Sequence, residues 1–244
     1  MKSEKQACME DIDLKIAFNY DAVVLADGEQ PEHAIPLRLL QEAPYIVCCD
    51  GAIQRCDWAD AVVGDGDSIP SWAREEYEDI FEQVDEQDDN DLTKATRHCI
   101  RKGFRRIVYL GATGRREDHT LGNISLLVRY AREFGIEPLL ATNYGWFVAA
   151  VSNAPATVPN APAAVPDGSP SGSPQCHTRV FHSFPGQQVS IINFGCTILQ
   201  TEGLKYNGYP FTSWWQGTLN EATDDHFRIV ADGDYLIFRT YDKK

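Results

Sequence analysis

The segment Ala61-Val-Val-Gly-Asp65-Gly-Asp67-Ser68 joins a short apolar run to two closely spaced carboxylates. Its length and its β-branched residues are typical of a buried strand, and the acidic residues come where such a strand ends. Carboxylates this close repel one another unless positive charge lies among them. Two interpretations therefore compete: a solvated acidic turn, or a site that holds a divalent metal together with the phosphates bound to it.

Other apolar runs in the first half of the chain have the same character. Helical patterns lie between them, and the clearest are residues 92–101 and 119–134, each with apolar residues along one face. Strands that are apolar throughout and that alternate with helices indicate an α/β fold with an open, mostly parallel sheet and helices on both faces. The further strand candidates are residues 22–26, 45–49 and 107–110.

The pattern changes after residue 150. Residues 152–175 are rich in Pro, Ala, Ser and Gly and lack apolar periodicity, which is typical of a mobile loop or linker. Apolar and polar residues then alternate, and Asp232-Gly233 separates two of these runs as in a β-hairpin. We therefore expect a small antiparallel domain of β-sandwich or barrel-like form. The predicted organisation is an α/β domain at 15–150, the loop or linker at 151–176, and a β-rich domain at 177–244.

Composition narrows the function. The formal net charge of −14 argues against nucleic acid as a partner, because binding to its backbone needs clustered Lys and Arg. No apolar run reaches the roughly 20 residues that span a bilayer, and the N-terminus lacks the apolar centre of a secretory signal. We therefore expect a cytoplasmic protein without membrane contact. The seven cysteines fit no usual zinc spacing, and Cys48 and Cys49 are expected to be small buried hydrophobes.

The chemistry of the acidic pair suits magnesium. Asp65 and Asp67 are two residues apart, so on an extended segment their side chains point the same way. Mg²⁺ prefers oxygen ligands and is usually held by one or two carboxylates plus the phosphates of a substrate. In a parallel sheet the loops that follow the strands gather at one edge. Asp50-Gly51 and the loop at 111–119 would therefore lie beside this pair.

A second acidic group, Gln87-Asp88-Asp89-Asn90-Asp91, precedes the helix expected at 92–101. Asp88 and Asp91 suit the start of a helix, as a cap or as acids of the first turn. The alternative is a phosphate site, because Lys94 follows at once and a helix N-terminus favours anions. On these residues alone, both interpretations stay open.

Two positive charges, Arg115 and Arg116, stand between an expected strand and helix. A guanidinium group matches phosphate in a bidentate manner, so this pair suits a phosphate clamp; the alternative is an exposed surface charge. His119 suits either a general base or a structural hydrogen-bonding residue, and we favour the latter. The chain contains no Gly-x-x-x-x-Gly-Lys-Ser/Thr segment, which excludes a P-loop kinase.

Taken together, these segments resemble the thiamine pyrophosphokinase family. Order and spacing agree over most of residues 45–130, and a weaker likeness covers 200–224. Gly66 departs from the family pattern, in which Phe is frequent, and is expected to loosen that turn; the region 152–175 looks inserted. The matching segments are Asp50-Gly51-Ala52, Gly64-Asp65-Gly66-Asp67-Ser68, Gln87-Asp88-x-x-Asp91-x-Thr93-Lys94, Gly114-x-Arg116-x-Asp118-His119 with Asn123, and Gly203-Leu-Lys-Tyr206.

The resemblance implies transfer of pyrophosphate from ATP to the hydroxyl of thiamine, with release of AMP, in a homodimer whose active sites lie between subunits. It implies that Asp65, Asp67 and Asp91 hold Mg²⁺ and that Arg116 and Asp118 are also catalytic. The residues implied to bind ATP are Asp50, Gln87, Asp88, Thr93, Lys94, Arg116, His119 and Asn123. Those implied to bind thiamine are Trp214, Trp215, Gly217, Asn220 and Glu221.

Two other functions fit parts of the sequence. An Asp-x-Asp pair after a strand also serves Mg-dependent nucleotidyltransferases and glycosyltransferases, which release different products. A non-catalytic nucleotide-binding module with the same fold is the second alternative. The presence of all the acidic positions together with Lys94 and Arg116 argues against that module.

Overall fold

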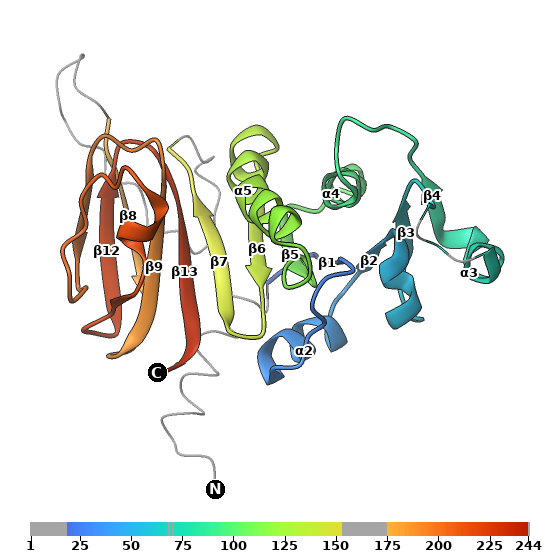
Figure 1. Ribbon diagram of the computed structural model, residues 1–244, viewed down its shortest axis with the longest axis horizontal. Helices are drawn as coiled ribbons and strands as arrows, with labels where there is room; N and C mark the ends of the chain where they lie inside the picture. Colours follow the sequence, from blue (N-terminus) through green and yellow to red (C-terminus); the bar gives the residue numbers. More distant parts are fainter. Residues whose placement is uncertain (1–18, 68, 70, 153–174, 244) are drawn as a thin grey trace, which may run out of the picture. The chain divides into compact units, whose positions relative to one another are not determined.

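The apolar runs of the first half form a parallel sheet in the computed structural model, which describes residues 19–67, 69, 71–152 and 175–243 (Figure 1). The chain divides into two compact units, which are described separately. The α/β unit comprises residues 19–127 and 136–144, and the β unit comprises residues 128–135, 145–152 and 175–243. The predicted loop or linker lies mostly outside the described residues, and β7 belongs to the β unit although it precedes residue 151.

Within the α/β unit the strand order is β6-β5-β1-β2-β3-β4, and every neighbouring pair is parallel. The central strands are buried along their whole length, which is why their sequences are continuously apolar. This confirms the mostly parallel sheet. The strands are β1 (Ala22–Leu25), β2 (Ile46–Cys49), β3 (Ala61–Gly64), β4 (Phe81–Gln83), β5 (Arg106–Leu110) and β6 (Glu137–Ala141).

Helices cover this sheet on both faces, as the alternating pattern predicts. From β1 to β4 the chain moves one way along the sheet, and from β4 through β5 to β6 it moves the opposite way. Right-handed crossovers therefore place α2 on one face and α4 on the other (Figure 1). The helices are α2 (Ala34–Gln41), η1 (Asp50–Arg55), α3 (Ser71–Glu76), η2 (Glu78–Ile80), α4 (Asp91–Arg101) and α5 (Glu117–Glu133), whose last turns belong to the β unit.

The packing of α4 explains why it forms where the sequence predicts a helix. Its buried face, which includes Leu92, Ala95 and Cys99, lies against β1, β2 and β3. Thr96 is also buried there, and its hydroxyl donates to the carbonyl of Leu92 at 2.7 Å and meets the hydroxyl of Tyr109 at 2.9 Å. A polar side chain is tolerated in this core because its hydrogen bonds are made.

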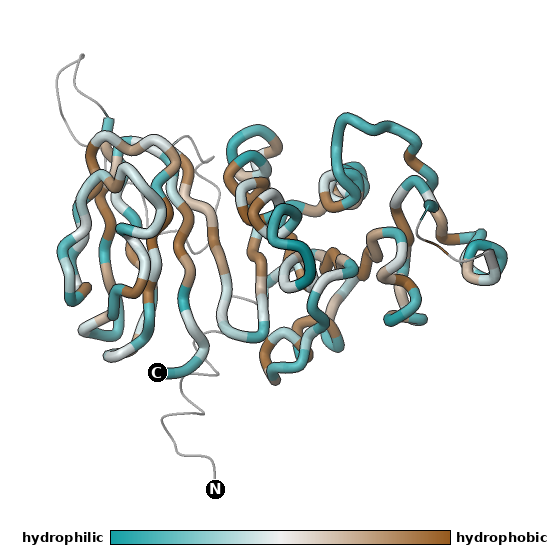
Figure 2. The backbone as a smooth tube through the Cα atoms, viewed as in Figure 1, coloured by the Kyte–Doolittle hydropathy of each residue, from teal (hydrophilic) through white to brown (hydrophobic). Residues whose placement is uncertain are grey.

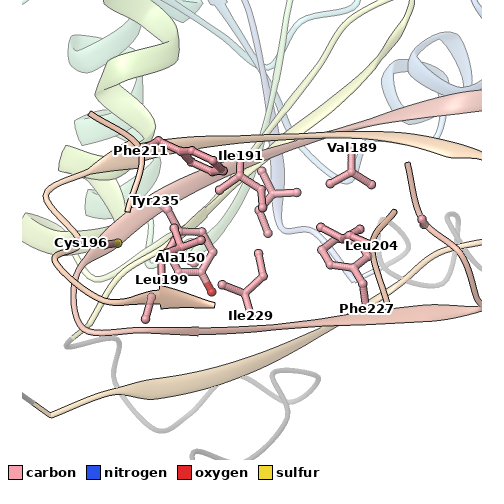
Figure 3. Packing of buried hydrophobic residues seen from close by; sticks show 13 residues of the cluster. Ala150, Val189, Ile191, Cys196, Leu199, Leu204, Phe211, Phe227, Ile229 and Tyr235 are labelled. Carbon is pink, nitrogen blue, oxygen red and sulfur yellow. The ribbon is translucent and has the colours of Figure 1, made fainter. Parts of the chain in front are cut away.

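The β unit is a sandwich of two antiparallel sheets. One sheet has the order β11-β9-β13-β7 and the other β10-β12-β8. Apolar side chains from both sheets, among them Ile191, Ile229 and Tyr235, form the core between them (Figure 3). This confirms the expected β-sandwich. The elements are β7 (Gly145–Ala150), β8 (His177–His182), β9 (Gln187–Phe194), β10 (Leu199–Glu202), η3 (Trp214–Gly217), β11 (Asn220–Glu221), β12 (His226–Ala231) and β13 (Asp234–Lys243).

The turn at Asp232-Gly233 does not close a β-hairpin, so that prediction is wrong. The strands on either side of it, β12 and β13, pair in different sheets. The Asp232 carboxylate accepts from the backbone N–H groups of Thr197 and Ile198, each at 2.8 Å. Asp232-Gly233 thus forms a corner where the chain passes from one sheet to the other. The Asp232 side chain stabilises this corner through its hydrogen bonds to the neighbouring turn at 195–198.

The distribution of apolar and polar residues along the chain agrees with the strands and loops of the two units. Figure 2 shows apolar residues along the strands and a hydrophilic connection between β4 and α4, where the second acidic group lies. Among the described residues, no helix combines the length and apolar character needed to cross a membrane.

His177, on β8, is a titratable residue whose two ring nitrogens are buried. The His177 ring stacks on the ring of Tyr235, with centroids 6.0 Å apart and planes 5° apart. Burial, reinforced by Arg179, lowers the pKa of His177, although Asp234 and Asp232 act in the opposite direction. The folded chain therefore resists protonation of this ring.

We predict that this histidine makes the β unit less stable in acid. The unfolded chain takes up a proton near pH 6.5 and the folded chain only at lower pH, so the free energy of unfolding falls as the pH drops below about 6.5. A His177→Phe variant keeps a stacked ring without the proton. Urea unfolding midpoints between pH 5 and 8 should fall less steeply on the acid side for this variant. Parallel curves for the two proteins would contradict the assignment.

Candidate functional site

The acidic pair lies at the carboxyl end of β3. One oxygen of Asp65 accepts from the backbone N–H of Asp67 at 3.0 Å, and the other accepts from the side-chain amide of Gln87 at 3.4 Å. The Asp67 N–H is the largest influence on the pKa of Asp65, and with Gln87 and Lys94 it lowers this pKa despite partial burial. Asp65 is therefore ionised at neutral pH.

Lys94 brings the two acidic groups together. Lys94 is only 4% exposed, and its ammonium lies 3.2 Å from a carboxylate oxygen of Asp91. Both residues belong to the start of α4. The same ammonium helps to lower the pKa of Asp65. A buried ammonium must be paired with negative charge. Asp65, Gln87, Asp91 and Lys94 therefore come together at one edge of the sheet.

The N-cap of α4 is Asn90, and neither of the aspartates considered for that role supplies it. Its side-chain oxygen accepts from the backbone N–H of Thr93 at 3.0 Å and from the Thr93 hydroxyl at 2.9 Å. Asp91 instead occupies the first turn and pairs with Lys94, and Asp88 is exposed. Asp91 therefore contributes its carboxylate to the pair with Lys94 and not to the cap.

The same asparagine connects two loops. Its amide donates to the side-chain oxygen of Asn123 at 3.0 Å, and the Asn123 amide donates to the carbonyl of Ala112 at 2.8 Å. The start of α4, the first turns of α5 and the loop after β5 are thus joined by hydrogen bonds. Asn123, which the resemblance assigns to ATP, is in contact with the start of α4.

Asp50 follows β2 at the same edge. It is 3% exposed and has a positive φ of 35°, which is unusual for a residue with a side chain. The neighbouring Cys49 thiol lies 3.7 Å from the carbonyl of Asp91, so the end of β2 contacts the start of α4. Residues after β2, β3 and β4 therefore converge, as the topology predicts.

Glycine at position 66 is explained by its backbone. Gly66 has φ +82°, a left-handed conformation that a phenylalanine would adopt only with strain. Its carbonyl accepts a hydrogen bond of 2.5 Å from the guanidinium of Arg74, which fastens the turn that we expected to be loose. Ser68 lies outside the described residues.

The loop at residues 111–116, which carries Arg115 and Arg116 and is called the arginine loop below, leads into α5. Arg116 forms a bidentate pair with Asp118, with distances of 3.1 and 2.6 Å, and both side chains are about two-thirds exposed. This pairing raises the pKa of Arg116 and lowers that of Asp118. The hydrogen bond at His119 is made by its backbone N–H, which donates to Asp118 at 2.9 Å. A carboxylate thus holds the guanidinium in the geometry that a phosphate would also satisfy.

Sequence reasoning missed Asp27 and Arg55. The carboxylate of Asp27 lies 2.5 Å from Arg115 and 3.4 Å from Arg55, at the same sheet edge as the acidic pair. The signal was present, because Asp27-Gly28 follows the first apolar run as Asp50-Gly51 follows the second.

The residues implied to bind thiamine form a group in the β unit. Trp214 and Trp215 are 44% and 75% exposed on η3, and the Trp214 ring lies against Phe194 with centroids 5.6 Å apart. Gly217 is the buried last residue of η3. The two tryptophans therefore leave apolar surface exposed.

Asn220 and Glu221 also fix the Gly203–Tyr206 segment. The Asn220 amide donates to the Tyr206 carbonyl at 2.8 Å, and its oxygen accepts from the Tyr206 N–H at 3.1 Å. The Glu221 carboxylate lies 3.4 Å from the Lys205 ammonium. The Asn220 side chain is thus used in hydrogen bonds to the backbone of Tyr206, whereas Glu221 is partly exposed.

A preformed metal cage is absent from the described part of the chain. No three His, Cys, Asp or Glu side chains there converge closely enough to hold an ion. Asp65 and Asp67 nevertheless offer hard oxygen donors, which suits an ion that is also held by phosphates.

These features define an α/β protein with charged loops at the carboxyl edge of its parallel sheet and with an added antiparallel β-sandwich. Family models match both parts: "Thiamin pyrophosphokinase, catalytic domain" at residues 37–137 and "Thiamin pyrophosphokinase, substrate-binding domain" at residues 173–238. Together they match more than half of the chain. The chain belongs to the thiamin pyrophosphokinase family.

Individual relatives agree with this. Thiamin pyrophosphokinase 1 of Caenorhabditis elegans is 30% identical over 105 residues, which cover 38% of this chain and 43% of the relative, so less than half of that relative is matched. The structure of thiamin pyrophosphokinase from Candida albicans is similar with a TM-score of 0.67 at 17% identity, covering 93% of this chain and 91% of that one. Thiamine pyrophosphokinase from Bacillus subtilis gives 0.64 at 19% identity, covering 91% and 99%. At these identities the two structures establish the fold.

We predict that Asn90→Ala destabilises the α/β unit. The change removes the cap of α4 and the bond to Asn123, which together should lower the free energy of unfolding by about 1–2 kcal/mol. Asn90→Ser is the matched control, because a hydroxyl restores the cap but not the link to Asn123. Denaturant titration should place the serine variant between the alanine variant and the parent chain. Equal stability of all three proteins would show that neither the cap nor the bond to Asn123 contributes to the free energy of unfolding.

Proposed function

We propose that this chain is a thiamine pyrophosphokinase, which transfers the terminal pyrophosphoryl group of ATP to the hydroxyl of thiamine and releases AMP. The observation that carries the proposal is the buried Lys94 at the carboxyl edge of the sheet, which pairs with Asp91 at 3.2 Å and helps to lower the pKa of Asp65. Such a cation, with flanking carboxylates, suits a ligand that brings both phosphate and a metal ion. Family membership supports the same conclusion.

The proposed phosphate contacts come from three loops. Lys94 would face the transferred group, because its ammonium already lies among the acids of the site. Arg116 would exchange the Asp118 carboxylate for a phosphate, since both bind a guanidinium in the same bidentate manner. The remaining residues proposed to line the ATP site are Asp50, Gln87, Asp88, Thr93, His119 and Asn123.

The donor set fits a magnesium ion that arrives with the nucleotide. Asp65 and Asp67 would hold it, with Asp91 as the third proposed acid across Lys94. Bound there, Mg²⁺ would neutralise phosphate charge and polarise the β-phosphoryl group. The low pKa of Asp65 keeps this ligand deprotonated at neutral pH.

In the proposed reaction the thiamine oxygen attacks the β-phosphorus of ATP, the bond from this phosphorus to the α–β bridging oxygen breaks, and the hydroxyl proton is lost to solvent. The chain's own contribution would be alignment and charge, because phosphoryl transfer needs little covalent work by the protein. We therefore propose a direct transfer without a phosphorylated protein. Detection of pyrophosphorylated chain during turnover would overturn this.

The acceptor would bind in the β unit. Thiamine is a cation, so the exposed faces of Trp214 and Trp215 and the carboxylate of Glu221 suit it through cation–π and charge attraction. We also propose a homodimer with active sites at the subunit interface, because Trp215 and Leu219 are more than two-thirds exposed. Sedimentation analysis would test the dimer.

The experiment that decides the function is product analysis. The protein would be incubated with ATP, Mg²⁺ and thiamine, and the products identified by phosphorus NMR. Thiamine pyrophosphate plus AMP would support the proposal, whereas free pyrophosphate or a nucleoside diphosphate would indicate a nucleotidyltransferase or glycosyltransferase. Mg-dependent ATP binding without any turnover would indicate a non-catalytic module.

We predict that Asp65→Asn lowers kcat/KM at least about a hundredfold, because it removes a charged ligand of the proposed metal. The melting temperature should fall slightly, because the lowered pKa of Asp65 means that its negative charge stabilises the folded chain and an amide lacks that charge. Asp79→Asn, at the amino end of β4, is the matched control and should be fully active. Normal activity of Asp65→Asn would exclude Asp65 from the metal site.

We predict that Trp215→Ala raises the KM for thiamine about tenfold, from the loss of roughly 1–2 kcal/mol of cation–π contact. The KM for ATP should not change, and Trp215→Phe should recover part of the loss because it restores a ring. Steady-state kinetics with each substrate varied in turn would measure both effects. An increase confined to the KM for ATP would place thiamine elsewhere.

A further inference from the structure

Two loops at the carboxyl edge of the sheet are joined along their backbones. The first, residues 26–29, follows β1, and the second, residues 111–116, follows β5 and contains both loop arginines. Gly28 N–H donates to the carbonyl of Gly111 at 2.6 Å, and Glu29 N–H donates to the carbonyl of Thr113 at 2.7 Å. These bonds continue the β1–β5 pairing beyond the strands.

This contact leaves no space for a side chain. A Cβ atom at Gly28 would lie 2.2 Å from the carbonyl oxygen of Gly111 and 2.4 Å from that of Thr113. Both contacts are with backbone atoms, which cannot turn aside as a flexible side chain would. Glycine at this position therefore allows the two loops to approach so closely.

Asp27 adds an ionic connection to the backbone one. Its carboxylate lies 2.5 Å from Arg115 in the 111–116 loop and 3.4 Å from Arg55 at the end of η1. Arg55 also donates to the carbonyl of Gly28 at 3.4 Å. One carboxylate thus links the arginine loop to the short helix that begins with Asp50.

The stability gained from these pairs is small. The side chains of Asp27, Arg115 and Arg55 are 42%, 49% and 36% exposed, and ion pairs this accessible to water contribute at most about 1 kcal/mol. Their effect is therefore on geometry: without the carboxylate, two neighbouring guanidinium groups would repel each other.

The residues that follow the 26–29 loop are held in place by Asn143. The side-chain oxygen of Asn143, which follows β6, accepts from the N–H groups of Glu32 and His33 at 2.7 and 3.1 Å. Its amide donates to the carbonyl of Gln30 at 3.0 Å. Asp27 is therefore held at a set place and can serve as an anchor.

We propose that Asp27 is a positioning residue for nucleotide binding, which acts through Arg115 to hold the 111–116 loop. The inference rests on the proposed function, because Arg116, the residue next to the anchored Arg115, is the proposed phosphate ligand. Asp27 itself would not touch the nucleotide. Its loss would let the loop move and so weaken ATP binding, while the binding of thiamine would be unaffected.

The test is the isosteric change Asp27→Asn. Isothermal titration should show Mg-ATP binding weakened about fivefold, which corresponds to roughly 1 kcal/mol. The KM for ATP should rise by a similar factor while the KM for thiamine stays constant, and Asp27→Glu should recover part of the loss. Hydrogen exchange of the peptides covering residues 111–116 should quicken. Unchanged ATP affinity in Asp27→Asn would overturn the proposal.

A double variant shows whether the effect passes through Arg115. If it does, Asp27→Asn combined with Arg115→Gln should bind Mg-ATP no more weakly than Arg115→Gln alone. Losses that simply add would overturn the proposed route. Glu42→Gln is the matched control, because it breaks the exposed pair between Arg38 on α2 and Glu42 just after the helix and should leave ATP binding as it was.

The two proposals fail in different ways. A parent chain that binds no Mg-ATP would overturn the proposed function, and the positioning role with it. A parent chain that makes thiamine pyrophosphate, together with a fully competent Asp27→Asn variant, would overturn the positioning role alone.

Discussion

The burial of the Lys94 ammonium is the constraint on which the candidate site depends. A charge taken out of water must be compensated by nearby opposite charge, and Asp91 at 3.2 Å supplies it while Asp65 contributes from the next loop. The two acidic segments, some 20 residues apart in the chain, are therefore no longer a source of repulsion alone. Each contributes negative charge that stabilises the same cation.

Several parts of this arrangement follow from residue pattern. The run Ala61–Gly64 is apolar throughout because β3 is buried on both faces, and the helix at 92–101 was predictable because its apolar residues line one face. Once the sheet is parallel, its loops must meet at one edge. The order of the segments alone could thus indicate that Asp50, Asp65 and Asp91 lie near one another.

Other features were beyond the sequence because the same residues serve several structures. Asp232-Gly233 suits a hairpin or a corner between sheets, and only the long-range pairing of β12 and β13 decides between them. Asn90 was one polar residue among four neighbours that could cap α4. The position of Asp27 after the first apolar run was visible in the sequence, but its ion pairs were not, because Arg55 and Arg115 are 28 and 88 residues away in the chain.

The burial of Lys94 has a further consequence for how the chain meets reactive molecules. Lysine-directed reagents attack the neutral amine. The side chain of Lys94 is 3% exposed and paired with a carboxylate, whereas that of Lys205 in the β unit is 52% exposed. Lys94 should therefore be acylated more slowly than Lys205. Its rate of labelling would therefore measure how easily a molecule from outside reaches the ammonium at the start of α4, and a ligand bound there should slow the reaction further.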